Sequence, residues 1–465
     1  MTTVQDFTQG SISRHLVRTA VPVFAGMLFQ TLYYLVDLYF VARLGGDAVA
    51  GVSAAGTLQF VVLALTQVLS VGTMVLISHA TGRKDRVDAN RAFHQSLVLA
   101  ALCGAGVLVG GYSLADSYTQ ALGANAATAT AAHQYLLTFL PALALQFAMV
   151  SAGAALRGMG IVTPTMIIQV ISVVINAILA PVLIAGWGTG KPLGVYGAGL
   201  ASTIAVAAAV VMLIVYFARL DTFVKFDRAL LRPQFDVWKR MFKVGLPAGG
   251  EFALMFVYMS IIFVLIRDVG AEAQAGFGIG SRVMQSLFIP GMAIAFAAAP
   301  IAGQNIGAGL NDRARRTFIV GAGMESVVML VLTLVIQVEG DTLVRIFASD
   351  PAVVAVGAQF LMIISFNFVA QGVIFTASGM FQALGNTVPA MISSATRVVT
   401  FAIPAVMLAR RPGFELRHLW YLSIATVTLQ AVFSVALLSR EWKKRVAAAS
   451  GTPSKAVAWA VAETG

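Results

Sequence analysis

The chain has 465 residues, of which 58% are hydrophobic and only 11% are charged, and its mean hydropathy is +0.85. A soluble globular protein carries about 25% charged residues, so this composition predicts a protein of the lipid bilayer and argues against a soluble enzyme. Basic residues gathered on one face of a membrane protein explain the net charge of +11, so we expect no nucleic-acid partner. The single cysteine, Cys103, excludes a disulfide framework and a multi-cysteine metal site, and we expect no metal centre or other cofactor.

Twelve apolar segments are long enough to cross about 30 Å of hydrocarbon as helices. Prolines lie inside or near the ends of several of them, and in a membrane bundle the neighbouring helices can satisfy the carbonyls that a proline leaves free. The chain is therefore predicted to be an all-α, multi-pass membrane protein without a cleaved targeting signal. The predicted spans are residues 19–42, 51–80, 94–113, 131–155, 163–186, 194–217, 244–266, 276–304, 318–338, 353–378, 388–409 and 419–438.

Lysine and arginine are distributed unevenly over the segments that connect these spans. With the N-terminus in the cytoplasm, the inner segments hold 22 of the 31 Lys and Arg residues, the outer segments hold seven, and Arg282 and Arg397 fall within spans. This bias predicts that both termini are cytoplasmic, in the inner membrane of the cell. The inner residues are Arg14, Arg18, Arg83, Lys84, Arg86, Arg91, Arg157, Arg219, Lys225, Arg228, Arg232, Lys239, Arg240, Lys243, Arg313, Arg315, Arg316, Arg440, Lys443, Lys444, Arg445 and Lys455.

The two halves of the sequence repeat each other at one constant offset. At this offset Pro22 aligns with Pro247 and Pro164 aligns with Pro389. Each half has six spans, an even number, so both halves enter the membrane with the same orientation. The repeat predicts two parallel six-helix lobes that are related by a pseudo-two-fold axis along the membrane normal.

The predicted domains are an N-lobe (1–218), a basic cytoplasmic linker (219–241), a C-lobe (242–440) and a cytoplasmic tail (441–465). The linker is interpreted either as an amphipathic helix at the lipid surface or as a plain connection. The apolar residues that favour the amphipathic helix are Phe223, Phe226, Leu230 and Leu231. Two duplicated lobes suit a transporter that alternates access between the two sides of a membrane.

Several motifs resemble those of the multidrug and toxin extrusion (MATE) family. They are VDLYFVARLGGDAVAGVS (36–53), SAGAALRGMGIVTPTM (151–166), GVYGAGLAS (194–202), PIAGQNIGAGLNDRARR (300–316) and MFQALGNTVPAM (380–391). The resemblance runs from about residue 15 to about residue 405. It implies a twelve-helix antiporter that expels mostly cationic, amphipathic organic compounds, driven by the inward flow of H⁺ or Na⁺.

Asp37 is the first candidate for the coupling group, because it lies in an otherwise apolar and aromatic span. A carboxylate deep in the bilayer costs several kcal/mol unless it is protonated, paired or hydrated. A group that is neutral in one state and anionic in another can exchange a proton for a cationic substrate. Gln30 and Tyr33 precede it by seven and four residues, on the same helix face, and are expected to complete the site.

The resemblance assigns two further residues of the N-lobe to this site. Asn176 and Ser202 match residues that help to build the N-lobe cation site in proton-coupled relatives. Those relatives often continue Asn-x-x-x-Asp-Pro, whereas this chain has Ala180 before Pro181. We therefore expect one acidic group in the N-lobe site instead of two.

Glu251, four residues after Pro247, is the second candidate acid. In sodium-coupled relatives a helix-7 glutamate serves in a C-lobe site about one turn further along, together with an aspartate in helix 10. The corresponding span here, 353–378, contains the amides Gln359, Asn367 and Gln371 but no acid. An isolated carboxylate is sufficient for a proton, so H⁺ is favoured over Na⁺ as the coupling ion.

Arg397 falls in the middle of a span and cannot deprotonate, so it must reach the interface, face a cavity or meet an acid. We expect it to form an ion pair with Glu251 in the C-lobe. An unpaired Arg397 would instead favour anionic or zwitterionic substrates. Glu325 lies nearer the inner end of its span and is interpreted as hydrated or paired.

Methionine and phenylalanine suit a promiscuous pocket, because methionine repacks easily and aromatic rings accept cations. The candidates for substrate contact in the C-lobe are Met255, Met259, Phe288 and Met292. We expect small organic molecules and membrane lipids as partners and a monomeric protein. The alternatives are a flippase for lipid-linked precursors from the same superfamily and, more distantly, an integral-membrane transferase.

Overall fold

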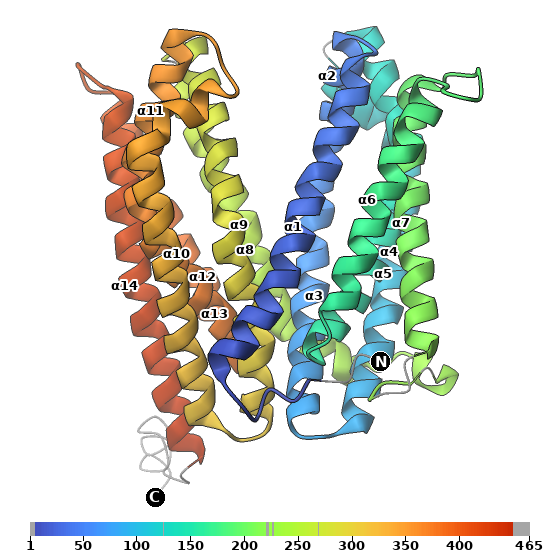
Figure 1. The fold of residues 1–465 in the computed structure, drawn as a ribbon, viewed down its shortest axis with the longest axis vertical. Helices are drawn as coiled ribbons and strands as arrows, with labels where there is room; N and C mark the ends of the chain where they lie inside the picture. Colours follow the sequence, from blue (N-terminus) through green and yellow to red (C-terminus); the bar gives the residue numbers. More distant parts are fainter. Residues whose placement is uncertain (1–4, 124, 220–222, 226, 268, 450–465) are drawn as a thin grey trace, which may run out of the picture. The chain divides into compact units, whose positions relative to one another are not determined.

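The computed structural model describes residues 5–123, 125–219, 223–225, 227–267 and 269–449, and these residues form helices and their connections, without a β-strand (Figure 1). Two residues that the sequence analysis uses, Phe226 and Lys455, lie outside the described residues, as does the end of the predicted tail. Within this described part of the chain, twelve helices or helix pairs are long and apolar enough to cross a membrane. The predicted all-α class with twelve spans is therefore confirmed.

In chain order the α-helices are α1 (Ile12–Ala42), α2 (Gly46–Gly56), α3 (Leu58–Gly82), α4 (Arg86–Leu122), α5 (Ala126–Gly158), α6 (Thr163–Ile184), α7 (Gly194–Arg219), α8 (Phe235–Arg267), α9 (Ala271–Gly307), α10 (Asn311–Arg345), α11 (Pro351–Ile364), α12 (Phe368–Leu384), α13 (Val388–Ala409) and α14 (Leu416–Ala449). Two 3₁₀ turns, η1 (Arg228–Leu231) and η2 (Ser365–Asn367), lie before α8 and between α11 and α12.

Most helices extend beyond the predicted spans, because polar end signals and not hydropathy set their limits. The carboxylate of Asp85 accepts a hydrogen bond from the backbone N–H of Asp88, which places the start of α4 at Arg86. Asn125 caps α5 in the same way through the N–H of Thr128. These caps satisfy backbone donors that the first turn of a helix leaves free.

Prolines do not end the helices, in agreement with the sequence analysis. α1 continues through Pro22 and α8 continues through Pro247. Pro164 and Pro389 lie in the first turns of α6 and α13, where the missing N–H removes no helical hydrogen bond. Two spans are interrupted instead at other points, one at Thr57 between α2 and α3 and one at η2 between α11 and α12.

The repeat of the sequence extends to the limits of the helices. The span Gly46–Gly82 has its counterpart in Ala271–Gly307, and both ends are displaced by the offset that relates Pro22 to Pro247. The same displacement relates Thr163–Ile184 to Val388–Ala409. The offset found in the sequence thus describes two halves with matching secondary structure.

The chain divides into two compact units, Met1–Gly249 and Gly250–Gly465, with the boundary inside α8. In the first unit α5 is central and packs against α2, α3, α4 and α7. In the second unit α9 packs against α10, α11 and α12. The predicted N-lobe, residues 1–218, lies within the first unit.

Glycines allow the helices of the first unit to approach closely around α7, the helix that carries Ser202. A Cβ atom at Gly199 would lie 2.6 Å from the carbonyl oxygen of Tyr135 on α5. A Cβ atom at Gly197 would lie 2.5 Å from the carbonyl oxygen of Leu183 on α6. Only glycine permits such backbone contact, so these positions fix the distance between α7 and its neighbours.

The described part of the linker between α7 and α8 is held against α4 by hydrogen bonds. The amide of Gln95 donates to the carbonyls of Leu230 (2.7 Å) and Arg232 (2.8 Å) and accepts from the N–H of Gln234 (2.9 Å). His94 Nε2 accepts from the N–H of Asp227 (2.8 Å). Between the end of α7 at Arg219 and the start of α8 at Phe235, which lies inside the predicted linker, the described residues form one short helix, the four-residue turn η1. The amphipathic helix is therefore wrong for these described residues.

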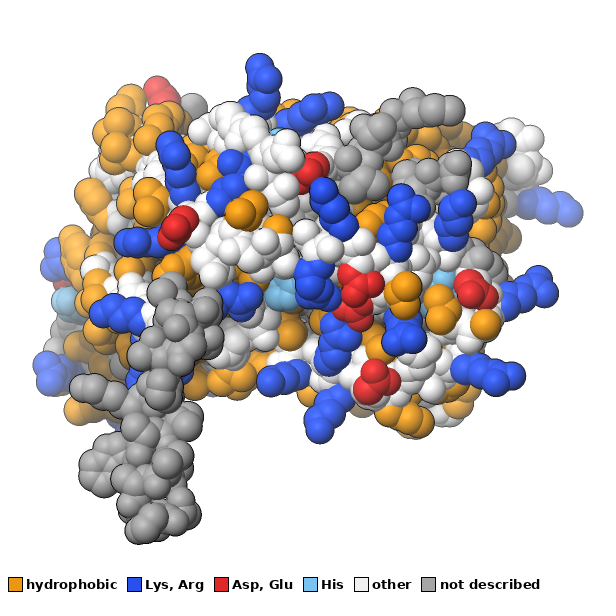
Figure 2. Space-filling view, turned by 90° about the horizontal axis from the view of Figure 1, so that it is seen from below, with side chains coloured by type: hydrophobic (Ala, Val, Ile, Leu, Met, Phe, Trp, Pro, Cys, Tyr) orange, Lys and Arg blue, Asp and Glu red, His pale blue; other side chains and the backbone are white. Residues whose placement is uncertain are grey.

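Basic residues are prominent at the end of the molecule that Figure 2 shows. In the first unit this basic character is partly compensated, because Asp88 accepts from Arg83 (2.7 Å) and from Arg240 (2.9 Å). The bond to Arg240 ties the start of α8 to the start of α4.

Candidate functional site

The carboxylate of Asp37 lies at a junction of three helices in the first unit. α1 carries Asp37, and Ser202 on α7 donates a hydrogen bond of 3.1 Å from its Oγ to Oδ2 of the carboxylate. Asn176 on α6 is fully buried and lies close enough to interact with the same carboxylate. The structure therefore brings together the three residues that the sequence analysis assigned to the N-lobe site.

This junction leaves buried polar atoms without partners among the described residues. Oδ1 of Asp37 and both polar side-chain atoms of Asn176 are buried and meet no hydrogen-bond partner. An unsatisfied buried polar atom costs about 1–3 kcal/mol, and a carboxylate costs more. A proton, a small cation or a water molecule at this position would relieve that cost, so the donor set fits an exchangeable ligand.

The remaining candidates of the N-lobe site lie along α1 and α6. Because α1 is one continuous helix, Gln30, Tyr33 and Asp37 share a face as expected, with Gln30 exposed and Tyr33 half-buried. Ala180 lies one turn after Asn176 on α6 and is fully buried. A buried methyl group thus occupies the place where relatives are expected to have a second acid.

Glu251 lies on α8 in the second unit and is bonded to α12. Oγ of Ser378 donates a hydrogen bond of 2.7 Å to its Oε2 atom. The Cβ that an alanine at the neighbouring Gly250 would add lies 2.9 Å from Sδ of Met391. Glu251 is therefore a half-buried carboxylate with one neutral donor, and no cation pairs with it among the described residues.

Arg397 on α13 contacts neutral groups, and the expected ion pair with Glu251 is wrong. Its Nη1 donates to Oε1 of Gln371 (3.0 Å) and Oε1 of Gln430 (3.5 Å). Its guanidinium carbon lies 4.1 Å from the centre of the Tyr258 ring.

Spacing along the helices explains why this ion pair does not form. Tyr258 follows Glu251 on α8 by seven residues, which is two turns or about 10 Å. On α12 Gln371 likewise precedes Ser378 by seven residues. Glu251 therefore meets Ser378 at one level of the unit, and Arg397 meets Tyr258 and Gln371 at another.

Glu325 on α10 is fully buried, so of its two interpretations, hydrated or paired, the hydrated one is wrong. Thr376 on α12 donates a hydrogen bond to its Oε2, and Oε1 is buried without a partner among the described residues. Gly291 on α9 and Gly372 on α12 make room for this side chain, because a Cβ atom at either would come within 3.1 Å of it. The periodicity of the span did not predict the burial of Glu325, because burial here depends on side chains and glycines of α9 and α12.

The four apolar candidates of the C-lobe differ in their positions. Met255 is 43% exposed, whereas Met259 and Phe288 pack against the core of the second unit and Met292 is half-buried. The Phe288 ring lies 4.6 Å from that of Phe368. Among these four side chains Met255 is the exposed one, and the other three offer less accessible surface.

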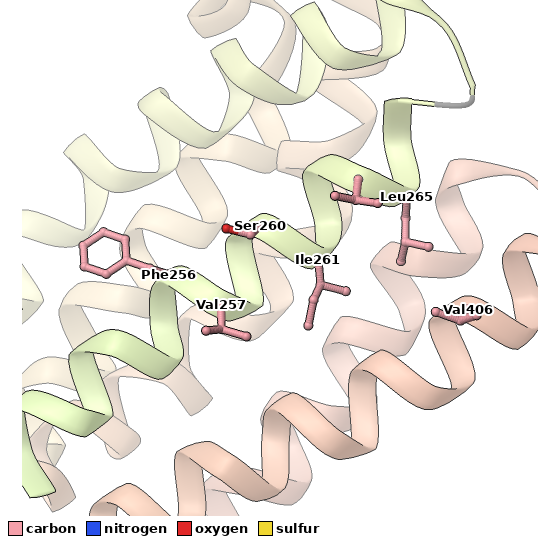
Figure 3. A pocket seen from close by; sticks show the side chains of 7 residues that line it. Phe256, Val257, Ser260, Ile261, Leu265 and Val406 are labelled. Carbon is pink, nitrogen blue, oxygen red and sulfur yellow. The ribbon is translucent and has the colours of Figure 1, made fainter. Parts of the chain in front are cut away.

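A groove of about 460 Å³ opens between α8 and α13 in the second unit (Figure 3). Its lining is apolar except for Ser260, and the sequence analysis did not identify it. The lining residues are Phe256, Val257, Ser260, Ile261, Val264, Leu265 and Val406.

Sequence reasoning missed Ser378, Thr376 and Gln430, the partners of Glu251, Glu325 and Arg397. A usable signal exists for one of them, because Gln371 and Ser378 are polar residues at a seven-residue spacing in an apolar span. Within the described residues no group of three or more His, Cys, Asp or Glu side chains is arranged to hold a metal ion.

The MatE family model matches two parts of this chain, residues 22–182 and 247–407. Both limits of the second match are displaced from those of the first by the offset of the repeat. Together the two matches cover more than half of the chain.

Curated proteins and solved structures are similar to the chain over nearly its whole length. It is 24% identical over 452 residues to the probable multidrug resistance protein YoeA of Bacillus subtilis (strain 168), covering 95% of this chain and 96% of that protein. It is 26% identical over 442 residues to the multidrug export protein MepA of Staphylococcus saprophyticus, covering 94% and 96%. A solved structure of the outward-facing conformation of a multidrug resistance MATE family transporter of the MOP superfamily superposes with a TM-score of 0.88 at 21% identity. That superposition covers 96% of this chain and 99% of the other.

Proposed function

The chain belongs to the MatE family of membrane transporters, and on that basis we propose that it exports amphipathic, mostly cationic organic compounds in exchange for an inward-moving cation. It is a multi-pass membrane protein and not an enzyme. The names of its relatives, a multidrug export protein and a probable multidrug resistance protein, support small-molecule export as the direction of transport.

The observation that carries the coupling proposal is the half-satisfied carboxylate of Asp37. One of its oxygens accepts from Ser202, whereas the other is buried without a partner among the described residues. A proton that binds to Asp37 neutralises its negative charge. A cationic substrate that binds to the unprotonated carboxylate balances the same charge. The two ligands thus compete for one group, which is the requirement for antiport.

In the proposed cycle Asp37 takes a proton from outside, and protonation weakens its hold on a cationic substrate. The neutral site favours the change in access, and release of the proton inside restores the carboxylate. A ligand shifts such an equilibrium only by its differential affinity for the two states. Coupling therefore depends on the difference in substrate affinity between the protonated and the charged form of Asp37.

We propose H⁺ as the coupling ion rather than Na⁺. A sodium ion needs several oxygen ligands around a charge, and Glu251 has Ser378 as its one hydrogen-bond partner in the described structure. The N-lobe site consists of the carboxylate of Asp37, the hydroxyl of Ser202 and the amide of Asn176. A proton needs only the carboxylate in order to bind there.

Location, orientation and substrate class complete the proposed function. We propose the cell inner membrane with both termini in the cytoplasm, because basic residues concentrate at the inner segments. An N-lobe (1–218) and a C-lobe (242–440), joined by a basic linker (219–241), are proposed to alternate access as a monomer in contact with lipid. A flippase for lipid-linked precursors remains the alternative substrate class within the superfamily. The transferase alternative is set aside, because the family consists of transporters.

Transport by the purified protein in proteoliposomes tests the proposal. A fluorescent cationic dye is supplied with either an imposed pH gradient or an imposed Na⁺ gradient, at zero membrane voltage. We expect the pH gradient alone to drive dye movement. Movement driven only by Na⁺ would contradict the proton assignment, and no movement with either gradient would contradict cation-coupled export.

A further inference from the structure

Arg397 is a cation held inside the second unit by neutral groups. Its Nη1 is engaged by the amide oxygens of Gln371 and Gln430, and the ring of Tyr258 lies against the guanidinium plane. The other amide edge of Gln430 is engaged too, since its Nε2 donates to Oγ of Ser394 (3.2 Å). These contacts fix the orientation of the guanidinium.

The opposite edge of the guanidinium has no acceptor in the described part of the chain. Nε is buried and without a partner, and the hydrogen bonds of the side chain all leave from Nη1. The Nε–H and one Nη2–H point the same way and form the fork that binds a carboxylate through two parallel hydrogen bonds. The neutral partners thus leave free the edge of Arg397 that recognises planar anions.

The charge of Arg397 is also uncompensated. No ion pair among the described residues involves it, Glu251 is bonded to Ser378 two turns away, and Glu325 is bonded to Thr376. A charged side chain within a membrane span is costly, and such residues face a cavity or bind an opposite charge. The second unit therefore contains a fixed positive charge that attracts an anion.

The repeat shows that this charge does not belong to the common scaffold of the two halves. At the offset of the repeat the counterpart of Arg397 is Ser172, whose Oγ donates to the carbonyl of Ala205 (3.0 Å). Conversely, the acidic site of the first unit is missing from the second. The counterparts of Asp37, Asn176 and Ser202 are Ile262, Phe401 and Val427, which are all buried.

We propose that Arg397 is the anion-binding group of the second unit and that it takes the carboxylate of an amphipathic zwitterion or organic acid during export. The inference rests on the export function proposed above and adds a carboxylate to the chemistry of its substrates. The first half offers a carboxylate and the second half offers a guanidinium at a different position of the same helical scaffold.

A carboxylate fits this site better than a phosphate. One guanidinium carries one charge, which balances a carboxylate but leaves a phosphate dianion undercompensated. The apolar groove of Figure 3 lies between α8 and α13, the helices that carry Tyr258 and Arg397. An apolar body attached to the carboxylate therefore has an apolar surface between the same two helices.

Binding of two matched dyes to the purified full-length protein tests this inference without requiring transport. One dye is a rhodamine with a free carboxylate, and the other is its methyl ester, which keeps the ring system and the positive charge. Fluorescence polarisation measures the affinity of each dye for the wild type, for Arg397→Gln and for Arg397→Lys. Arg410→Gln is the matched control, because Arg410 is an exposed residue just after α13.

We expect Arg397→Gln to weaken binding of the free acid by about tenfold or more, since a hydrogen-bonded charge pair is lost. Binding of the ester should change by less than about twofold, which also shows that the variant is folded. Arg397→Lys keeps the charge without the fork and should give an intermediate loss, and Arg410→Gln should change neither affinity. Equal losses for both dyes, or no loss for either, would overturn the inference.

The same dyes separate this inference from the proposed function. In one outcome the wild type exports the ester, and Arg397→Gln binds the free acid as tightly as the wild type does. This outcome would support export and refute the anion site. In the other outcome Arg397→Gln weakens binding of the free acid, but the wild type moves neither dye under any gradient. This outcome would support the anion site and refute export.

Discussion

The hydroxyl of Ser202 lies 3.1 Å from the carboxylate of Asp37, although 165 positions separate the two residues in the chain. The bond connects α7 to α1 and is the one hydrogen bond that this carboxylate accepts among the described residues. A hydrogen bond to a charged group contributes about 1.5–3 kcal/mol. Ser202 therefore stabilises the charged form that the proposed cycle needs for substrate binding.

Replacing Ser202 by alanine should reduce dye export by about tenfold or more without unfolding the protein, because the charged carboxylate loses that donor. Initial rates in proteoliposomes under a pH gradient measure the effect. Ser172→Ala is the matched control, since Ser172 bonds the carbonyl of Ala205 between α6 and α7 without touching Asp37. Equal export by the wild type and Ser202→Ala would show that the bond has no role in coupling.

Gly199→Ala should lower the thermal stability of the protein, because the new Cβ would lie 2.6 Å from the carbonyl oxygen of Tyr135 and would push α7 from α5. Overpacking of this kind costs about 1–3 kcal/mol. Gly106→Ala on α4 serves as control, since no heavy atom lies within 4 Å of the Cβ it would add. Melting curves of the purified variants test the difference. A melting temperature for Gly199→Ala at or above that of Gly106→Ala would contradict the packing.

Hydropathy and spacing predicted the number and order of the spans, because lipid requires long apolar helices whatever their packing. The ends of the helices were predicted less well, since residues such as Asp85 and Asn125 extend them through capping. Asp37 was predicted from the cost of a carboxylate in an apolar span, and Asn176 and Ser202 were predicted from the family resemblance. The three residues lie together in the structure. Partners such as Ser378 and Thr376 were not predictable, because a single sequence does not specify which helix faces meet.

Glu325→Gln should leave dye export near the wild-type level, because the amide oxygen still accepts from Thr376 inside the enclosure of α9, α10 and α12. Glu325→Ala should lower the stability by about 2–4 kcal/mol, since it creates a cavity and leaves Thr376 without its acceptor. Export rates and melting temperatures of both variants give the two readouts. Loss of export in a folded Glu325→Gln protein would indicate that Glu325 carries a coupling proton.

Gln95→Ala should release the linker from α4, because Gln95 makes three hydrogen bonds with the backbone of residues 230–234. Limited trypsin digestion in detergent should then cut faster after Arg228, whereas the bond after Arg232 resists trypsin because Pro233 follows it. Gln120→Ala provides the comparison, since Gln120 is exposed near the other end of the same helix. Unchanged cleavage rates in Gln95→Ala would show that other contacts, such as that of His94 with Asp227, hold the linker alone.

Different arguments from the sequence led to Asp37 and to the expected pair of Arg397 with Glu251, and the structure contradicts the pair. Asp37 was identified by the cost of a carboxylate in the bilayer, an argument that needs no knowledge of packing. The pairing of Arg397 with Glu251 was inferred from charge alone, whereas the actual partners follow from the spacing of seven residues along α8 and α12. Whether two charged residues pair depends on the distance between their helices and on which faces of the helices meet. The repeat predicts the number and order of the helices but not the residues that face each other.

The most direct test of the account compares Asp37→Asn with the wild type in proteoliposomes that carry a fluorescent cationic dye and an imposed pH gradient. Asp116→Asn is the matched control, because this aspartate is exposed on α4 in the same unit. We expect pH-driven dye movement in the wild type and in the control, and its loss in a folded Asp37→Asn protein. Full pH-driven movement with Asp37→Asn would contradict the assignment of Asp37 as the group that exchanges the proton for the substrate.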